Sequence, residues 1–287
     1  MKTLVAILVF VLLHIIFPPS TSWASISLSI SPYLLEFEVP AGGVRTFTLT
    51  LHNEGDKKAE IKAYLRSLHL SLSGEPQPGE SEEGDFSCAS WISLKPLKFT
   101  IEPESKKKIT GILKVPRGQR GGRYACILFE TDSTNAEESV RISTRLGVVV
   151  MVTVPRTGRR KGEIVNFSAA PTEEGVFFKV IFHNTGNVHI RATSTVVIMD
   201  EEEKIVDRIN LSGGTGTVLP SEKREFSGVW KRKRRITPGK KYIAEVRVIF
   251  PGGRWVRKRF EFFLSPENLG EKQASGPGFK GGDARNL

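Results

Sequence analysis

The second half of this chain repeats the first, and the repeat limits the folds that the chain can adopt. The segment Leu51–Gly55 (LHNEG) recurs as Phe182–Gly186 (FHNTG), and Glu102–Gly111 recurs as Leu219–Gly228. The spacing between matched residues falls from 131 at the first pair to 117 at the second, because the first copy carries a polar excursion, Leu68–Phe86. A duplication within 287 residues predicts two homologous domains in tandem.

Each copy consists of short alternating stretches separated by turns. In Val44–Leu51, for example, apolar residues alternate with threonines, and a period of two indicates a β-strand. Such stretches arrive every ~8–12 residues, and no window has the amphipathic period of a helix. The sequence therefore predicts an all-β protein of two tandem immunoglobulin-like β-sandwiches. The expected parts are a first sandwich at 25–155, a basic linker at 156–162, a second sandwich at 163–264 and a disordered tail at 265–287.

The stretch Val140–Pro155 (VRISTRLGVVVMVTVP) is interpreted as the last strand of the first sandwich. At ~3.3 Å per residue it would span about 50 Å. Its first half alternates apolar with polar or basic residues, and both faces are apolar from Leu146 onward, so that half should be covered by protein or by a partner. If the strand is a docking edge, the outward residues that contact a partner are Arg141, Arg145, Val149 and Met151.

The N-terminus has the pattern of a secretory signal peptide. Lys2 precedes the apolar run Leu4–Phe17, two prolines follow, and Ser22-Trp23-Ala24 places small residues at −3 and −1. We expect cleavage after Ala24, although an uncleaved anchor is the alternative, and the run is shorter than the ~20 residues that span a membrane. No later segment is long and apolar enough to span one, so the mature chain is expected in the periplasm or at the cell surface.

Two cysteines, Cys88 and Cys126, fit an oxidising compartment. Tyr124 lies two residues before Cys126, which is the tyrosine-corner spacing of immunoglobulin-like domains. An even count favours a Cys88–Cys126 disulfide, which would contribute about 4 kcal/mol in the loop-entropy treatment. Two separately buried thiols are the alternative, because the second copy has no cysteine.

The net charge of +11 favours acidic partners. Five consecutive basic residues precede the Tyr242 strand and form a candidate anion-binding patch for wall glycan, lipid headgroup or acidic protein; the alternative is a solvated loop. These residues are Lys231, Arg232, Lys233, Arg234 and Arg235. Charge alone would allow nucleic acid, but the export signal disfavours it. The aromatic stretch Arg254–Leu264 is expected to pack in the core and between the domains.

No recognised catalytic motif is present. The sequence contains no His-Glu-x-x-His, paired Cys-x-x-Cys, Gly-x-Ser-x-Gly or Walker pattern. His52 and His183 occupy matched places before Asn-x-Gly turns, which indicates an inherited turn rather than a catalytic pair. We therefore predict no enzyme activity, no cofactor and no metal site.

The first copy resembles the first domain of periplasmic pilus chaperones. The resemblance lies in Trp91–Ile101 (WISLKPLKFTI), Val115-Pro116 and Gly122–Tyr124. It implies two immunoglobulin-like domains, donation of the last strand of the first domain to an exported pilus subunit, and a basic pair that holds the subunit's C-terminal carboxylate. Arg141 or Arg145 could supply the strand member of that pair. The sequence departs from the family because 25–39 contains no Lys or Arg, and the polar 132–139 stands where the donor run is expected.

A second resemblance gives a different partner. Ser143–Gly147, Val152–Pro155 and Asn184–His189 are similar to exported WxL-interacting proteins of bacterial cell surfaces. That family pairs a wall-glycan-binding β-domain with a domain that recruits a protein, and it usually ends in a membrane anchor that this sequence lacks. Both resemblances imply an exported, non-enzymatic binding protein. The partner is an exported protein subunit, bound by strand addition, in the first case and peptidoglycan or another anionic cell-wall polymer in the second.

Overall fold

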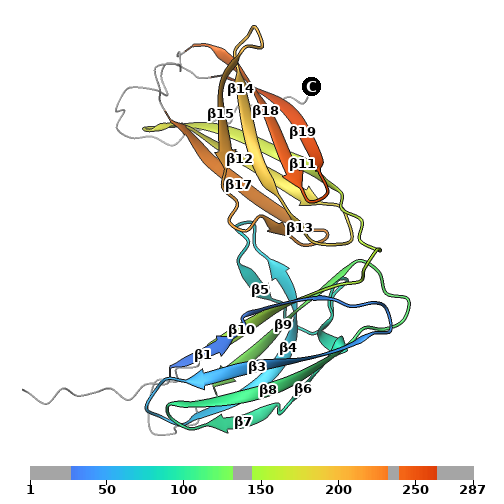
Figure 1. The fold of residues 1–287 in the computed structure, drawn as a ribbon. Helices are drawn as coiled ribbons and strands as arrows, with labels where there is room; N and C mark the ends of the chain where they lie inside the picture. The colour runs from blue at the N-terminus through green and yellow to red at the C-terminus, as the bar shows by residue number, and fades with distance from the viewer. Residues whose placement is uncertain (1–26, 132–143, 232–238, 264–287) are drawn as a thin grey trace, which may run out of the picture.

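The computed structural model describes residues 27–131, 144–231 and 239–263 (Figure 1). The expected signal peptide at 1–24 and the tail at 265–287 lie outside the described residues. Figure 1 shows two β-sandwiches end to end, which confirms the predicted fold class. Within the described residues, no helix is long and apolar enough to cross a membrane.

The first sandwich is built from ten strands and one 3-10 turn, η1 (Ala89–Trp91). The strands are β1 (Leu28–Ser31), β2 (Leu34–Glu38), β3 (Val44–Asn53), β4 (Ala59–Leu70), β5 (Pro76–Pro78), β6 (Ile92–Lys95), β7 (Lys98–Ile101), β8 (Ser105–Lys114), β9 (Gly122–Thr131) and β10 (Arg145–Thr153). One sheet has the order β1-β3-β8-β6, and the other has the order β2-β10-β9-β4-β5, with β7 also paired to β4. Alternate residues from both sheets, such as Leu49, Ile109, Ile127 and Val150, meet in one buried core.

The second sandwich contains nine strands. They are β11 (Gly162–Thr172), β12 (Gly175–Asn184), β13 (Ile190–Arg191), β14 (Thr193–Met199), β15 (Ile205–Leu211), β16 (Thr217–Val218), β17 (Lys223–Lys231), β18 (Lys241–Phe250) and β19 (Arg254–Phe263). The sheet β11-β12-β17 packs on the sheet β15-β14-β18-β19, and β13 pairs with β16. Its core is aromatic, with the Phe178 ring stacked on both Phe167 and Trp230.

The repeated Asn-x-Gly motif has the same structural role in both sandwiches. The Asn53 side chain donates to the carbonyls of Lys57 and Ile101 and accepts from the Gly55 N–H. The Asn184 side chain donates to the carbonyls of Val188 and Val218 and accepts from the Gly186 N–H. Both asparagines are fully buried. Each closes its own turn and also binds a carbonyl that is distant in the sequence, that of Ile101 or Val218.

The aromatic stretch of β19 differs in part from the expectation that it packs inside. Phe260 and Phe262 do face the core of the second sandwich. Trp255 and Phe263, however, are 55% and 63% exposed. The alternation of β19 explains the difference, because residues of opposite parity point to opposite faces of the sheet.

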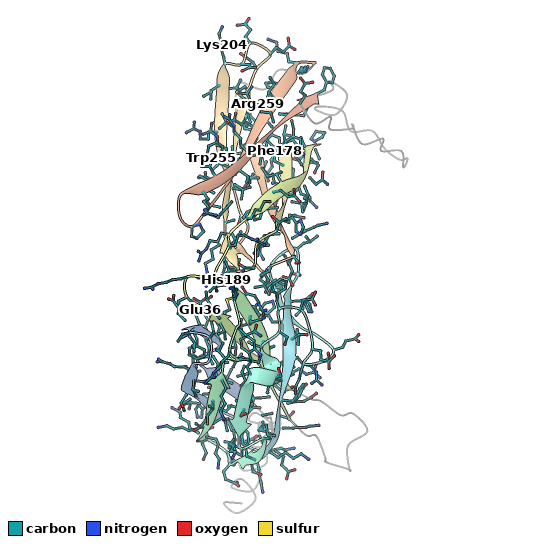
Figure 2. All side chains as sticks on the ribbon, turned by 90° about the vertical axis from the view of Figure 1, so that its right-hand side faces the viewer. Glu36, Phe178, His189, Lys204, Trp255 and Arg259 are labelled. Atoms are coloured by element: carbon teal, nitrogen blue, oxygen red, sulfur yellow. The ribbon has the colours of Figure 1, made fainter. Side chains whose placement is uncertain are left out.

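The two sandwiches touch through polar contacts and a small apolar cluster. The backbone N–H of His189 donates to the Tyr124 hydroxyl at 2.6 Å, and the Arg191 guanidinium pairs with Glu36. Figure 2 labels Glu36 and His189 at this junction. Leu219 of the second sandwich is buried with Tyr124 and Met151 against the outer face of the first. The excursion after Leu68 also contributes, because the Leu72 carbonyl accepts from the N–H of Glu225 on β17.

Candidate functional site

The described part of the long strand is shorter than predicted, and it is paired on both sides for only part of its length. β10 starts at Arg145, and 140–143 lie outside the described residues, as does the candidate Arg141. It runs antiparallel to β9 over its whole length and parallel to β2 from Val149 to Thr153. Among the described residues no strand pairs with Arg145–Val148 on the β2 side.

Main-chain groups point out of this open half of β10. The Val149 N–H donates to the Tyr33 carbonyl at 2.9 Å, and the Thr153 carbonyl accepts from Val39 at 3.0 Å, so odd-numbered residues face β2. The Thr144 carbonyl accepts from Thr131 at 3.0 Å, so even-numbered residues face β9. Because these directions alternate along an antiparallel strand, the N–H and C=O groups of Arg145 and Gly147 face the open side.

Apolar side chains flank this opening. Tyr33, immediately before β2, is 74% exposed, and its neighbour Leu34 is also exposed. Leu146 is half-buried against the core of the first sandwich, while Gly147 presents no side chain. An approaching polypeptide would therefore meet an unhindered backbone edge with apolar surface beside it, which is the setting for strand addition.

Arg145 is held at the end of β10 that lies farthest from the second sandwich. Its guanidinium pairs with Glu130 at 2.9 Å, and the Tyr64 hydroxyl donates to the same carboxylate at 2.9 Å. The other end of β10 is opposite Gly122, whose N–H donates to Asn187 of the second sandwich. Arg145 is thus an ion-paired residue at the entrance to the open edge.

Met151 cannot be a surface contact, contrary to the sequence prediction. Its side chain is 5% exposed and lies in the cluster with Tyr124, Leu128 and Leu219. Val149 is half-buried against the same cluster. The second sandwich and Phe86 cover this outer face from Val149 onward, so the covering that the apolar pattern required comes from the protein itself.

The predicted disulfide is absent, and the expectation of a Cys88–Cys126 bridge is wrong. Both cysteines are free and buried. Cys88 belongs to the core between the two sheets, whereas Cys126 points to the outer face with Tyr124 and Leu128. The two thiols therefore lie on opposite sides of the β9 sheet. Burial raises the pKa of the Cys126 thiol to about 11 and raises that of Cys88 further.

Tyr124, which has the tyrosine-corner spacing, lies at the junction of the two sandwiches. Its hydroxyl contacts the second sandwich, accepting from the His189 N–H at 2.6 Å and lying 3.3 Å from His189 Nδ1. Burial, with the nearby positive charge of Arg191, lowers the pKa of His189 to about 4. His189 is therefore neutral near pH 7, and its Nδ1 can accept a hydrogen bond from the Tyr124 hydroxyl. This contact could not be predicted from the sequence, because nothing in the pattern shows that the two loops meet.

The cleft between the sandwiches does not supply the basic pair that the chaperone resemblance implies. It encloses about 230 Å³, has an apolar floor that includes Phe86 and Leu219, and carries the polar groups of His69, Asp85 and Glu222. Within the described part of the chain, no Lys or Arg lines it. A partner's carboxylate would meet two acidic side chains here. Of the predicted anionic-ligand patch, Lys231 is exposed, and Arg232 to Arg235 lie outside the described residues.

No protein-family model matches the sequence, and no curated protein matches it. Among solved structures, the chain is similar to the class 5 fimbriae chaperone CfaA, with 12% identity and a TM-score of 0.45 over 81% of this chain and 98% of that chain. It is also similar to the E. coli chaperone DraB, with 13% identity and a TM-score of 0.42 over 83% and 98% of the two chains. A third similar structure is the Pseudomonas aeruginosa CupB2 chaperone, with 13% identity and a TM-score of 0.37 over 83% and 100%. Likeness at this level does not transfer a function.

Proposed function

We propose that this chain is an exported, non-enzymatic binding protein of the chaperone type, which takes up an extended segment of an exported protein along the open half of β10. The observation that carries the proposal is the gap beside Arg145–Val148, where β10 lacks a strand on the β2 side among the described residues. Strand addition draws affinity from main-chain hydrogen bonds and specificity from alternate side chains.

The surroundings of the gap support this use. The odd-numbered residues of the gap direct their main-chain groups outward, and Tyr33 and Leu34 offer exposed apolar contact beside it. An unpaired edge of this kind can pair with another chain, and a bound segment would cover it. The partner's segment would extend the sheet in line with β2, and its apolar side chains would cover Leu146 and Tyr33.

Amide hydrogen exchange, measured residue by residue by NMR, tests this directly. Strand-like peptides of alternating apolar residues, selected from a display library against the mature chain, serve as the partner. Binding should protect the amides of Arg145 and Gly147, which face the gap, and leave those of Leu146 and Val148 unchanged because β9 already bonds them.

A proline at Gly147 removes the outward N–H without touching the β9 ladder, so Gly147→Pro should weaken peptide binding at least tenfold. Val44→Lys is the surface control, since Val44 is exposed on β3 in the other sheet. Binding that leaves the Arg145 and Gly147 amides unprotected, or that survives Gly147→Pro, would overturn strand addition at this edge.

A further inference from the structure

The outer face of the second sandwich carries an ordered group of arginines that no fold requirement explains. Neighbouring outward positions on β18 and β19 are filled by charged and large apolar residues. We call this set the basic–aromatic face; it consists of Lys241, Ile243, Glu245, Arg247 and Ile249 on β18 and Trp255, Arg257, Arg259, Glu261 and Phe263 on β19. Figure 2 labels Trp255 and Arg259 on this strand.

Glu245 organises the arginines. It is only 3% exposed although it stands on the outer face of the sheet. Arg247 Nε donates to it at 2.7 Å, and Arg259 Nε donates at 3.1 Å. Burial would raise the pKa of Glu245, but these hydrogen bonds outweigh it and hold the pKa below its ordinary value. The carboxylate therefore stays ionised and holds two guanidiniums on the face by hydrogen bonds.

The face keeps an excess of positive charge after these pairings. Arg257 Nη1 is 3.9 Å from Glu245, and its guanidinium lies 5.5 Å from the centre of the Trp255 ring. Arg259 also pairs with Glu203 at 3.3 Å, so three arginines share two carboxylates. Lys241 and Glu261 on the same face pair with each other at 2.8 Å and add no net charge. The side chain of Arg257 is more than half exposed, which leaves most of its donors available to an acidic group.

Apolar side chains lie at both ends of the arginine group. Ile249 and Trp255 are directly opposite each other on β18 and β19 and are 45% and 55% exposed. Phe263, at the far end of β19, is also exposed. Aromatic residues and arginine are the side chains enriched at protein interfaces. One sugar ring could cover Trp255, but an apolar contact at each end of the strand fits the larger surface of a protein.

We infer that the basic–aromatic face is a second docking surface, and that its occupant is an acidic protein segment with apolar side chains. Carboxylates of that segment would pair with Arg257 and the outer donors of Arg247, and its apolar groups would cover Trp255 and Phe263. Two copies joined through this same face are disfavoured because the positive face would oppose itself. The surface is separate from the open half of β10, which belongs to the other sandwich.

Three soluble polymers distinguish the possible occupants in titrations of the full mature chain followed by calorimetry. A Glu/Tyr copolymer supplies an acidic, aromatic polypeptide, poly-glutamate supplies charge alone, and heparin supplies an anionic polysaccharide. We expect the copolymer to bind at least tenfold more tightly than poly-glutamate of equal length, with heparin no tighter than poly-glutamate. Raising the salt concentration should weaken all three.

The double variant Trp255→Ala/Arg257→Gln should lower copolymer affinity at least tenfold. Both side chains are exposed, and Glu245 keeps its contacts to Arg247 and Arg259. The matched control is Val44→Ala/Arg45→Gln, which removes an exposed apolar residue and its neighbouring arginine from β3 and should change affinity less than twofold. Equal copolymer binding by the double variant and the wild type would overturn the inference. Heparin binding that is tightest and lost in the double variant would also overturn it, in favour of a polysaccharide.

Discussion

The first strand pairs differently in the two sandwiches, and this difference determines which strand edge each sandwich leaves unpaired. In the first sandwich the strand is split around Pro32: β1 pairs with β3 in one sheet, and β2 pairs with β10 in the other. In the second sandwich β11 stays with β12 along its whole length, apart from one irregularity near Ile164. The split gives β10 a second partner, β2, over its second half only, whereas β19 has a partner on one side only.

The exposed edges of the two sandwiches also carry different side chains. The open half of β10 offers Gly147 and nearby apolar side chains, which favour the approach of another strand. The edge strand β19 carries Arg254, Arg257, Lys258 and Arg259, and charged edges oppose pairing with other chains. The two sandwiches thus differ at their exposed edges, which are apolar beside β10 and charged along β19.

What the two sandwiches share can be tested at the buried asparagines, where we expect the largest effect. Asn184→Ala leaves the carbonyls of Val188 and Val218 without their donor, and Asn53→Ala does the same to Lys57 and Ile101. Each change should lower the free energy of unfolding of its own sandwich by about 2–4 kcal/mol, since buried groups left unpaired cost ~1–3 kcal/mol each. Urea denaturation measures this, with Trp230 fluorescence reporting the second sandwich.

Asn210→Ala is the control, because Asn210 is exposed on β15. If the two buried asparagines differ in cost by several kcal/mol, the sandwiches do not use the repeated motif equivalently, and the comparison fails at its strongest point.

Local patterns of the sequence predicted the strands and turns of the fold, but not the pairing between distant segments. Alternation in Val44–Leu51 and the repeated Asn-x-Gly placed strands and turns correctly, because strand period and turn chemistry are local properties. Pairing between distant segments is not local. Nothing in Leu28–Glu38 shows that its two halves join different sheets, and therefore the half-open edge of β10 could not be read from the sequence.

The candidate site was predicted less well for the same reason. Arg145 and Val149 were placed on one face of a strand correctly, but the period of two could not show that Leu219, from the other sandwich, buries Met151. The cysteine spacing likewise gave no information on which face each thiol occupies. The arginine group around Glu245 was missed because its members come from two strands and meet only through the register of β18 with β19.

The two copies differ at the junction, where burial of His189 should make the free energy of unfolding depend on pH. His189 corresponds in the repeat to Lys58 of the first copy. His189 contacts the other sandwich through the Tyr124 hydroxyl. Its pKa is about 4 in the folded chain, against about 6.5 when unfolded. Stability from the neutral imidazole is complete above about pH 6.5 and is lost as the pH falls toward 4, because the unfolded chain takes up a proton that the folded chain does not.

This loss should reach about 2–3 kcal/mol between pH 6.5 and 4, at 1.36 kcal/mol per unit of pKa difference. Carboxylates titrate in the same range, so the quantity to measure is the difference between the wild type and His189→Gln in urea denaturation at each pH. His52→Gln is the control, since His52 pairs with Glu54 inside the first sandwich and is not at the junction. If the free energies of unfolding of the wild type and His189→Gln change in parallel with pH, the His189 contact makes no contribution to the pH dependence of stability.

The cysteines give the smallest effect and the last test of likeness between the copies. The second sandwich folds around its aromatic core without any cysteine, and the two thiols of the first lie on opposite sides of the β9 sheet. A reductant should therefore leave the melting temperature unchanged, because no bond exists for it to break. Burial raises the pKa of both thiols, so at pH 8 neither should react with a thiol reagent in the folded protein. Mass spectrometry after labelling in denaturant without reductant should then find two modified cysteines per chain. A single unlabelled, oxidised species, or a lower melting temperature in reductant, would mean that the first sandwich depends on a cross-link that the second does not have.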